Sequence, residues 1–129
     1  MKKSLLTVAG LLLGTSALAD GHQPVLTVYA PDYFGSEWGP GPSIEEAFEA
    51  FCECDLQYQT GDLLPRLMLE GARTEADVAI GFNTDVTKRA RDSGMFAPHG
   101  LDLSPLTLPI DWDDDTFLPF NYGHTAFIY

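Results

Sequence analysis

The sequence has 129 residues, with 19 acidic against 7 basic side chains and a formal net charge of −12. So acidic a chain is a poor binder of nucleic acid or anionic membranes, and it favours a cationic ligand. Residues 1–19 have the pattern of a secretory signal peptide: Lys2 and Lys3, a short apolar run, and small residues ending at Ala19. The apolar run is too short to span a membrane. We therefore expect residues 20–129 to form one exported, soluble domain.

Two cysteines, Cys52 and Cys54, are separated by a single residue. The oxidising compartment of an exported chain permits a disulfide between them, although so small a ring departs from relaxed geometry. Buried free thiols remain an alternative, and so does a metal or redox pair.

Short apolar runs predict the strands. Residues 25–30 are uncharged β-formers, as in a strand buried on both faces, and residues 54–58 and 77–82 predict a second and a third strand. Helical patterns between these runs imply a parallel sheet with right-handed crossovers, which is an α/β fold. Residues 117–120 and 125–129 have the pattern of two further strands.

Helices are predicted between and after the strands. Ser43 and Glu46 form a capping box, and the apolar face of the first helix follows at Ile44, Ala47, Phe48 and Phe51. A second helix follows the turn 60–62, with Pro65 in its first turn and Gly71 at its end. The third helix follows Asn83 and Thr84, has Arg89 and Arg91 near its end, and stops at Gly94.

A parallel sheet binds ligands beyond the carboxyl ends of its strands. The loops after the three strands, residues 31–42, 59–62 and 83–84, must therefore share one edge of the sheet. They carry aromatic faces, a carboxylate and small polar groups at Tyr33, Phe34, Trp38, Gly61, Asp62, Asn83 and Thr84. Such a mixture suits a flat, cationic, hydrogen-bonding ligand.

The string Trp38-Gly39-Pro40-Gly41-Pro42 is the most distinctive short motif. Its prolines stiffen the loop and its glycines permit close approach of the backbone. Trp38 then either faces a ligand, where a cation on its ring is stabilised, or plugs the edge of the sheet.

Catalytic and metal motifs are weak. Asp111, Asp113 and Asp115 match the start of a calcium loop, but Thr116 replaces the required glycine and Tyr122 the required glutamate. His99 and His124 lack metal-ligand spacing. The two cysteines, the remaining nucleophiles, fall at the edge opposite the predicted site. We expect no catalytic residue, no metal ligand and no cofactor.

The chain resembles the periplasmic thiamine-binding proteins of bacterial ABC transporters. The resemblance rests on short strings over residues 24–129, most specifically the Trp-Gly-Pro-Gly-Pro motif near a Cys-x-Cys. The other strings are 25–29, Asp32, Phe34, 47–50, 66–67, 70–71, 76–78, 115–117, 119–120, 122–123 and 126–127. It implies the first lobe of a two-lobed binding protein, and the apolar end at residues 127–129 makes us expect a fragment.

What the resemblance implies is the periplasmic capture of thiamine, and of its phosphates as a further candidate, by a monomer that delivers it to an inner-membrane permease. Trp38 corresponds to an aromatic residue of the family's cleft. Tyr33, Asp62, Gly61, Asn83 and Tyr122 complete the expected ligand site. Pro31 and Asn83 depart from the family pattern, which has Tyr and Asp there, and the loop 60–62 is shortened.

Two alternatives stay open. Thiamine-degrading enzymes resemble the same two-lobed fold and use a cysteine nucleophile, so Cys52 or Cys54 would have to reach the cleft as a thiolate. A binding protein for another small cation, such as choline or a basic amino acid, or for a metal would fit the same composition.

Overall fold

The computed structural model describes residues 23–123 and 126–128, so the expected signal peptide lies outside the described residues. The regular elements are, in chain order, β1 (Val25–Ala30), α1 (Gly41–Cys52), β2 (Asp55–Thr60), α2 (Leu63–Glu70), a 3-10 turn (Gly71–Arg73), β3 (Val78–Ala79) and α3 (Thr84–Asp92). No helix in the described part of the chain is long and apolar enough to cross a membrane.

The three strands form a parallel sheet in the order β2-β1-β3. β1 lies in the centre and pairs with β2 along its whole length, from Val25 opposite Asp55 to Ala30 opposite Thr60. β3 is a two-residue strand, with Val78 opposite Val28. The predicted α/β fold is confirmed. β1 has its predicted bounds, whereas the third strand is shorter than residues 77–82.

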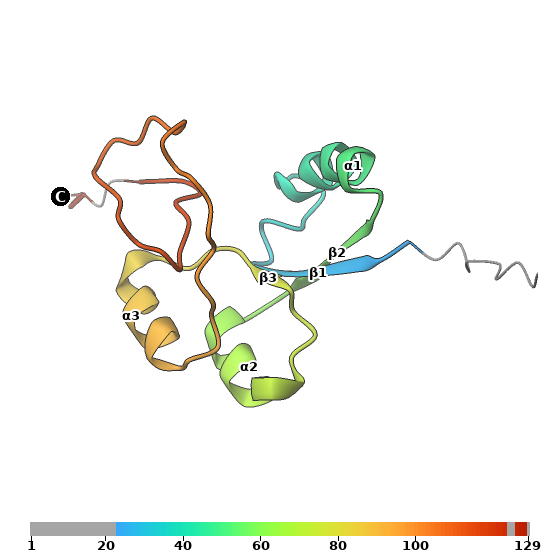
Figure 1. Ribbon diagram of the computed structural model, residues 1–129, viewed down its shortest axis with the longest axis horizontal. Helices are drawn as coiled ribbons and strands as arrows, with labels where there is room; N and C mark the ends of the chain where they lie inside the picture. Colours follow the sequence, from blue (N-terminus) through green and yellow to red (C-terminus); the bar gives the residue numbers. More distant parts are fainter. Residues whose placement is uncertain (1–22, 124–125, 129) are drawn as a thin grey trace, which may run out of the picture.

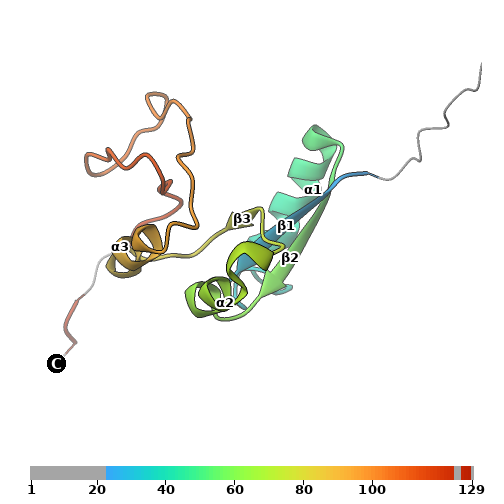
Figure 2. The ribbon, with the colours of Figure 1, turned by 60° about the horizontal axis from the view of Figure 1, so that its bottom comes forward.

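Helices lie on both faces of the sheet. The chain moves from β1 outward to β2 and then back across β1 to β3, so right-handed crossovers place α1 on one face and α2 on the other (Figure 1). Tyr29 packs with Leu63 and Leu67 on the α2 face. A second cluster of Leu64, Ala90 and Phe117 joins α2 to α3 and to the C-terminal segment, which lies apart from the sheet in Figure 2.

The helix ends correct one prediction and confirm others. The capping box is wrong, because α1 begins at Gly41 with Pro40 as its N-cap, and Ser43 lies inside the helix. A proline in the first turn has its φ preset and needs no hydrogen-bond acceptor, so with Pro42 in this turn the helix starts three residues early. In α2, Pro65 lies in the first turn and Gly71 is the C-cap, as predicted.

The predicted C-terminal strands are not found. Residues 117–120 and 126–128 are irregular, while residues 125 and 129 lie outside the described range. The backbone N–H groups of Thr116 (2.9 Å) and Phe117 (3.0 Å) donate hydrogen bonds to Oδ1 of Asp114. This side chain takes the place of the acceptors that a neighbouring strand would supply. This turn places the Phe117 side chain against α2 and α3.

Candidate functional site

The three loops that leave the carboxyl ends of the strands meet at one edge of the sheet, as predicted. The N–H of Gly61 donates to the carbonyl oxygen of Ala30 at 3.2 Å, which joins the second loop to the end of β1. Gly81 has φ 106°, and a Cβ there would lie 2.6 Å from Cγ of Pro31. Only glycine fits so close to Pro31 at this backbone angle, so the third loop packs against the first.

Short backbone hydrogen bonds fold the loop of residues 31–40 into a compact unit. The N–H of Phe34 donates to Pro31, that of Gly39 to Ser36, and that of Gly41 to Phe34, each at 2.9 Å. A Cβ on Gly41 would lie 2.6 Å from the Phe34 oxygen, so this position requires glycine. These hydrogen bonds within the loop therefore hold it in this compact shape.

The aromatic residues of this loop divide into one buried and two exposed side chains. Phe34 is 2% exposed, and its ring lies 5.6 Å from the rings of Tyr58 and Phe120. Tyr33 is 64% exposed and Trp38 91% exposed. Phe34 thus fills the space at this edge of the sheet. The alternative prediction, that Trp38 fills it, is wrong. The loop therefore presents the rings of Tyr33 and Trp38 to solvent.

The polar residues predicted to bind the ligand lie at the N-termini of two helices at the same edge. Asp62 is the N-cap of α2 and Asn83 the N-cap of α3, and neither side chain makes a capping hydrogen bond. Both residues are exposed. Gly61 (φ 143°) turns the chain into Asp62. These side chains therefore remain available to a ligand at the edge.

Negative charge concentrates at this edge. The loops and helix starts over residues 31–40, 61–62 and 81–85 contain four carboxylates and no lysine or arginine; the carboxylates are Asp32, Glu37, Asp62 and Asp85. All four are exposed. Unopposed carboxylates beside exposed aromatic rings attract a cation and raise its rate of association.

Tyr122 lies on a different segment. Its side chain is 71% exposed, and the ring contact between Phe120 and Phe34 brings this part of the C-terminal segment to the first loop. Five of the six predicted ligand residues thus belong to the three loops at the carboxyl ends of the strands, an edge here called the carboxyl edge. They are Tyr33, Trp38, Gly61, Asp62 and Asn83. Tyr122 lies two residues beyond Phe120, whose ring contacts Phe34 of the first loop.

A second polar cluster, which the sequence analysis missed, lies under α2. The Glu70 carboxylate accepts hydrogen bonds from Arg66 Nε (2.7 Å), the Tyr29 hydroxyl (3.0 Å) and the Thr74 hydroxyl (2.9 Å). The hydrogen bond from Arg66 is the main cause that lowers the pKa of Glu70. The Arg66 guanidinium also lies 3.9 Å from the centre of the Tyr29 ring.

This cluster borders a cavity of about 350 Å³, lined by Tyr29, Arg66, Glu70, Arg73 and Glu75. Its charges are balanced between two arginines and two glutamates, and they tie α2 to β1. We interpret it as structural. Arg66 and Glu70 are four residues apart on a helix, which is the one sequence signal that could have indicated the pair.

The aspartate-rich turn over residues 111–115 is also structural. Partial burial opposes ionisation of Asp114, but hydrogen bonds from Phe117, Arg91 and Thr116 outweigh it and lower the pKa of the carboxyl group. Within residues 23–123 and 126–128, no group of three or more His, Cys, Asp or Glu is placed to hold a metal ion. The turn thus links α3 to the C-terminal segment through the ion pair of Asp114 with Arg91.

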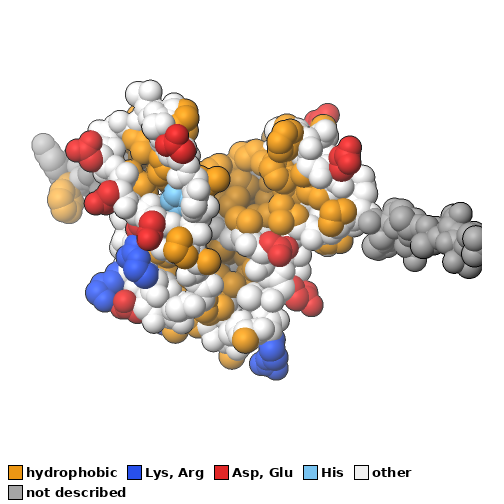
Figure 3. All heavy atoms as spheres, viewed as in Figure 1, with side chains coloured by type: hydrophobic (Ala, Val, Ile, Leu, Met, Phe, Trp, Pro, Cys, Tyr) orange, Lys and Arg blue, Asp and Glu red, His pale blue; other side chains and the backbone are white. Residues whose placement is uncertain are grey.

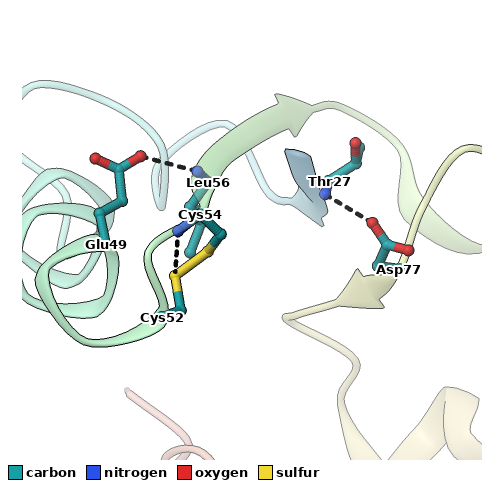
Figure 4. Close-up of a disulfide and its surroundings, with 6 residues drawn as sticks. All are labelled: Thr27, Glu49, Cys52, Cys54, Leu56 and Asp77. Carbon is teal, nitrogen blue, oxygen red and sulfur yellow. Dashed lines mark hydrogen bonds between the residues drawn. A yellow bond between two sulfur atoms is a disulfide. The ribbon is translucent and has the colours of Figure 1, made fainter. Parts of the chain in front are cut away.

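The two cysteines form a disulfide at the opposite edge of the sheet (Figure 4). The bond joins Cys52, the last residue of α1, to Cys54. The next residue, Asp55, donates its N–H to the carbonyl oxygen of Pro24, the residue before β1. A disulfide sulfur is not a thiolate, so neither Cys52 nor Cys54 is a nucleophile in this state. Of the three states left open by the sequence, the structure has the local disulfide.

Comparison with known proteins agrees with this arrangement. The chain is 42% identical over 130 residues to the thiamine-binding periplasmic protein of Brucella suis, a match that covers 98% of this chain and 37% of the relative. It is 42% identical over 111 residues to that of Escherichia coli, with 83% and 34% covered. The Haemophilus influenzae protein is 41% identical over 134 residues, with 100% and 40% covered.

A solved structure described as a periplasmic thiamin binding protein matches the fold with a TM-score of 0.73 and 41% identity. This match covers 76% of the present chain and 32% of the other. No family model matches the sequence. The chain spans between 34% and 40% of the length of these three curated relatives.

Proposed function

We propose a function for this chain from the family to which it belongs, the periplasmic thiamine-binding proteins. In this proposal the protein captures thiamine in the periplasm and delivers it to an inner-membrane ABC permease. Residues 1–19 act as the export signal, and residues 20–129 form part of the first of two lobes. The protein works as a monomer without a cofactor.

The observation that carries the proposal is the composition of the carboxyl edge. Its two exposed rings and four carboxylates, with no lysine or arginine in the three loops, are complementary to a flat aromatic cation. Thiamine combines a thiazolium cation with a hydrogen-bonding aminopyrimidine ring. The relatives matched here are named for binding this compound.

Each proposed site residue has a distinct task. Trp38 and Tyr33 stack on the cationic ring. The Asp62 carboxylate supplies the counter-charge, and the Gly61 backbone lets the ligand approach. The amide of Asn83 holds the polar edge of the pyrimidine, and Tyr122 adds an aromatic contact from the C-terminal segment. The same lining accepts thiamine phosphates only if a cationic group for the phosphate comes from elsewhere, because these loops contain none.

A thiamine-degrading enzyme is the less favoured reading. Its nucleophile would be Cys52 or Cys54, and these are joined to each other at the edge away from the proposed site. The relatives are named as binding proteins. Incubation with thiamine under oxidising and reducing conditions distinguishes the two, because a binding protein leaves the concentration of thiamine unchanged in both.

Calorimetric titration of thiamine into the full-length gene product tests the proposal, with choline, arginine and thiamine phosphate titrated in parallel. We expect a one-to-one complex with thiamine, without turnover and with weaker binding of choline and arginine. Residues 20–129 alone should bind weakly or not at all, because closure of two lobes buries such ligands. Equal affinity for all the cations would contradict thiamine as the ligand.

Trp38→Ala in the full-length gene product should weaken thiamine binding by about 1–3 kcal/mol, as truncation of an aromatic anchor commonly does. The matched control is Phe51→Ala, because Phe51 is 84% exposed on α1, outside the three loops. An unchanged dissociation constant for Trp38→Ala would assign the residue no part in binding.

A further inference from the structure

The first loop, residues 31–40, packs on the end of β2. Its buried residue Phe34 meets the ring of Tyr58 at 5.6 Å in an edge-to-face arrangement, with 63° between the ring planes. Hydrophobic side chains gather between α1 and the C-terminal segment (Figure 3), the part of the molecule through which this loop runs in Figure 1. The loop therefore lies on an apolar surface that includes Tyr58.

The loop backbone passes close to Tyr58 twice. A Cβ on Gly35 would lie 3.5 Å from the Cβ of Tyr58. A Cβ on Gly41, the first residue of α1, would lie 3.3 Å from Cε2 of the same side chain. Trp38 is 91% exposed and lies between these two close approaches along the chain. The position of Trp38 therefore depends on how the loop packs on Tyr58.

The ring of Tyr58, rather than its hydroxyl group, makes these contacts. The hydroxyl oxygen is buried and has no hydrogen-bond partner among the described residues. Burial is the main cause that raises the pKa of Tyr58, and the negative charge of Glu45 on α1 raises it further. A buried hydroxyl without a partner lowers stability, so the favourable contribution of this residue comes from its ring.

The neighbours of Tyr58 on β2 show how far the loop extends over the strand. Leu56, Tyr58 and Thr60 lie on one face, because every second side chain of a strand points to the same side. A Cβ on Gly35 would lie 2.9 Å from Cγ2 of Thr60, at the end of the strand. Leu56 is 5% exposed and lies nearer the start, where its N–H contacts Glu49 of α1. The loop thus packs on the last residues of this face.

We propose that Tyr58 is a positioning residue of the ligand site, whose ring holds the first loop in the shape that presents Tyr33 and Trp38. A loop that already has its binding shape loses less conformational freedom when the ligand arrives, and this increases affinity. Tyr58 acts on the ligand through the loop alone. The consequence for thiamine rests on the proposed function, whereas the consequence for the loop does not.

Amide hydrogen exchange of the ligand-free, full-length gene product tests the effect on the loop. In Tyr58→Ala, the amides of Phe34 and Gly41, which donate hydrogen bonds inside the loop, should exchange at least about tenfold faster because the loop opens locally. Tyr58→Leu keeps an apolar side chain without the ring and should accelerate the same amides less. Tyr58→Phe should exchange like wild type and keep or raise the Tm, since it removes the unpartnered hydroxyl.

Leu56→Ala is the matched control, because it opens a cavity on the same face of the same strand. It should lower the Tm and leave the loop amides as protected as in wild type. Wild-type exchange of the loop in both Tyr58→Ala and Tyr58→Leu overturns the proposal. Equal acceleration of the loop amides in Leu56→Ala also overturns it, since the effect would then be a general loss of stability.

Calorimetric titration of thiamine into the same variants tests the effect on binding. A loop that keeps its binding shape for only about a tenth of the time raises the apparent Kd about tenfold, and we expect this of Tyr58→Ala. Tyr58→Phe and Leu56→Ala should bind like wild type. Fast loop amides with an unchanged Kd in Tyr58→Ala overturn the positioning role. Failure of the wild-type protein to bind thiamine would instead contradict the proposed function, and hydrogen exchange would still decide the role of Tyr58 in the loop.

Discussion

The helices α1 and α2 have comparable amphipathic patterns, but they are attached to the sheet in different ways. α2 buries Leu63, Leu64 and Leu67 and adds the Arg66–Glu70 cluster. α1 is attached to β2 through the carboxylate of Glu49, ends at the Cys52–Cys54 disulfide, and leaves its phenylalanines exposed. An amphipathic pattern therefore shows that a helix needs an apolar partner, but it does not identify that partner.

The different attachment of the helices also affects how the proposed ligand residues are held in place. Asp62 is the N-cap of α2 and Asn83 the N-cap of α3, so apolar packing of α2 and α3 holds two of the proposed ligand residues in place. The first loop instead depends on its own backbone hydrogen bonds and on Phe34. The proposed site thus has one part fixed by the core and another fixed locally.

The largest effect is expected from Leu67→Ala, which removes a 3% exposed side chain between α2 and Tyr29. It should lower the free energy of unfolding by about 2–5 kcal/mol, because the packed neighbours cannot fill the space. Urea unfolding of residues 20–129 measures this loss. Leu69→Ala on the same helix is the control, and a similar loss there would contradict the difference in burial.

Glu49→Ala tests the polar attachment of α1. It leaves the N–H of Leu56, a residue only 5% exposed, without the carboxylate that it contacts, and should cost about 1–3 kcal/mol of stability. The measurement is again urea unfolding, with Glu46→Ala as the exposed control on α1. If both variants are equally stable, the hydrogen bond does not hold the helix.

The smallest effect concerns pH. The pKa of Glu70 lies below its ordinary value of 4.5, chiefly through Arg66, so the carboxylate contributes stability that is fully present above pH 4.5. That contribution is lost as the pH falls through the lower pKa of the folded state. Wild-type stability should therefore fall more steeply below pH 4.5 than that of Glu70→Gln.

Denaturant unfolding at a series of pH values checks this slope. Glu46→Gln serves as the control, because Glu46 is exposed on α1 and should retain the wild-type dependence on pH. Parallel curves for wild type and Glu70→Gln would show that the cluster under α2 contributes nothing to acid stability.

Local patterns predicted most of the regular structure. The bounds of β1, the C-cap at Gly71 and the parallel direction of the strands follow from runs of β-formers, from glycine geometry and from chain connectivity. The errors lie where side chains compete with the pattern. Pro42 lets α1 start before the predicted capping box. The Asp114 side chain accepts a backbone hydrogen bond from Thr116, and the chain there forms a turn where a strand was predicted to follow.

By itself, the sequence determined the fold class, the edge of the sheet where three loops must meet, and the acidic, aromatic character of that edge. These properties depend on strand direction, residue type and charge, which are readable along the chain. Only the tertiary structure decided that Phe34 rather than Trp38 fills the edge, that the cysteines are joined, and that Phe48 and Phe51 on α1 stay exposed. Such outcomes depend on which surfaces meet in space, and residues distant in the sequence settle them.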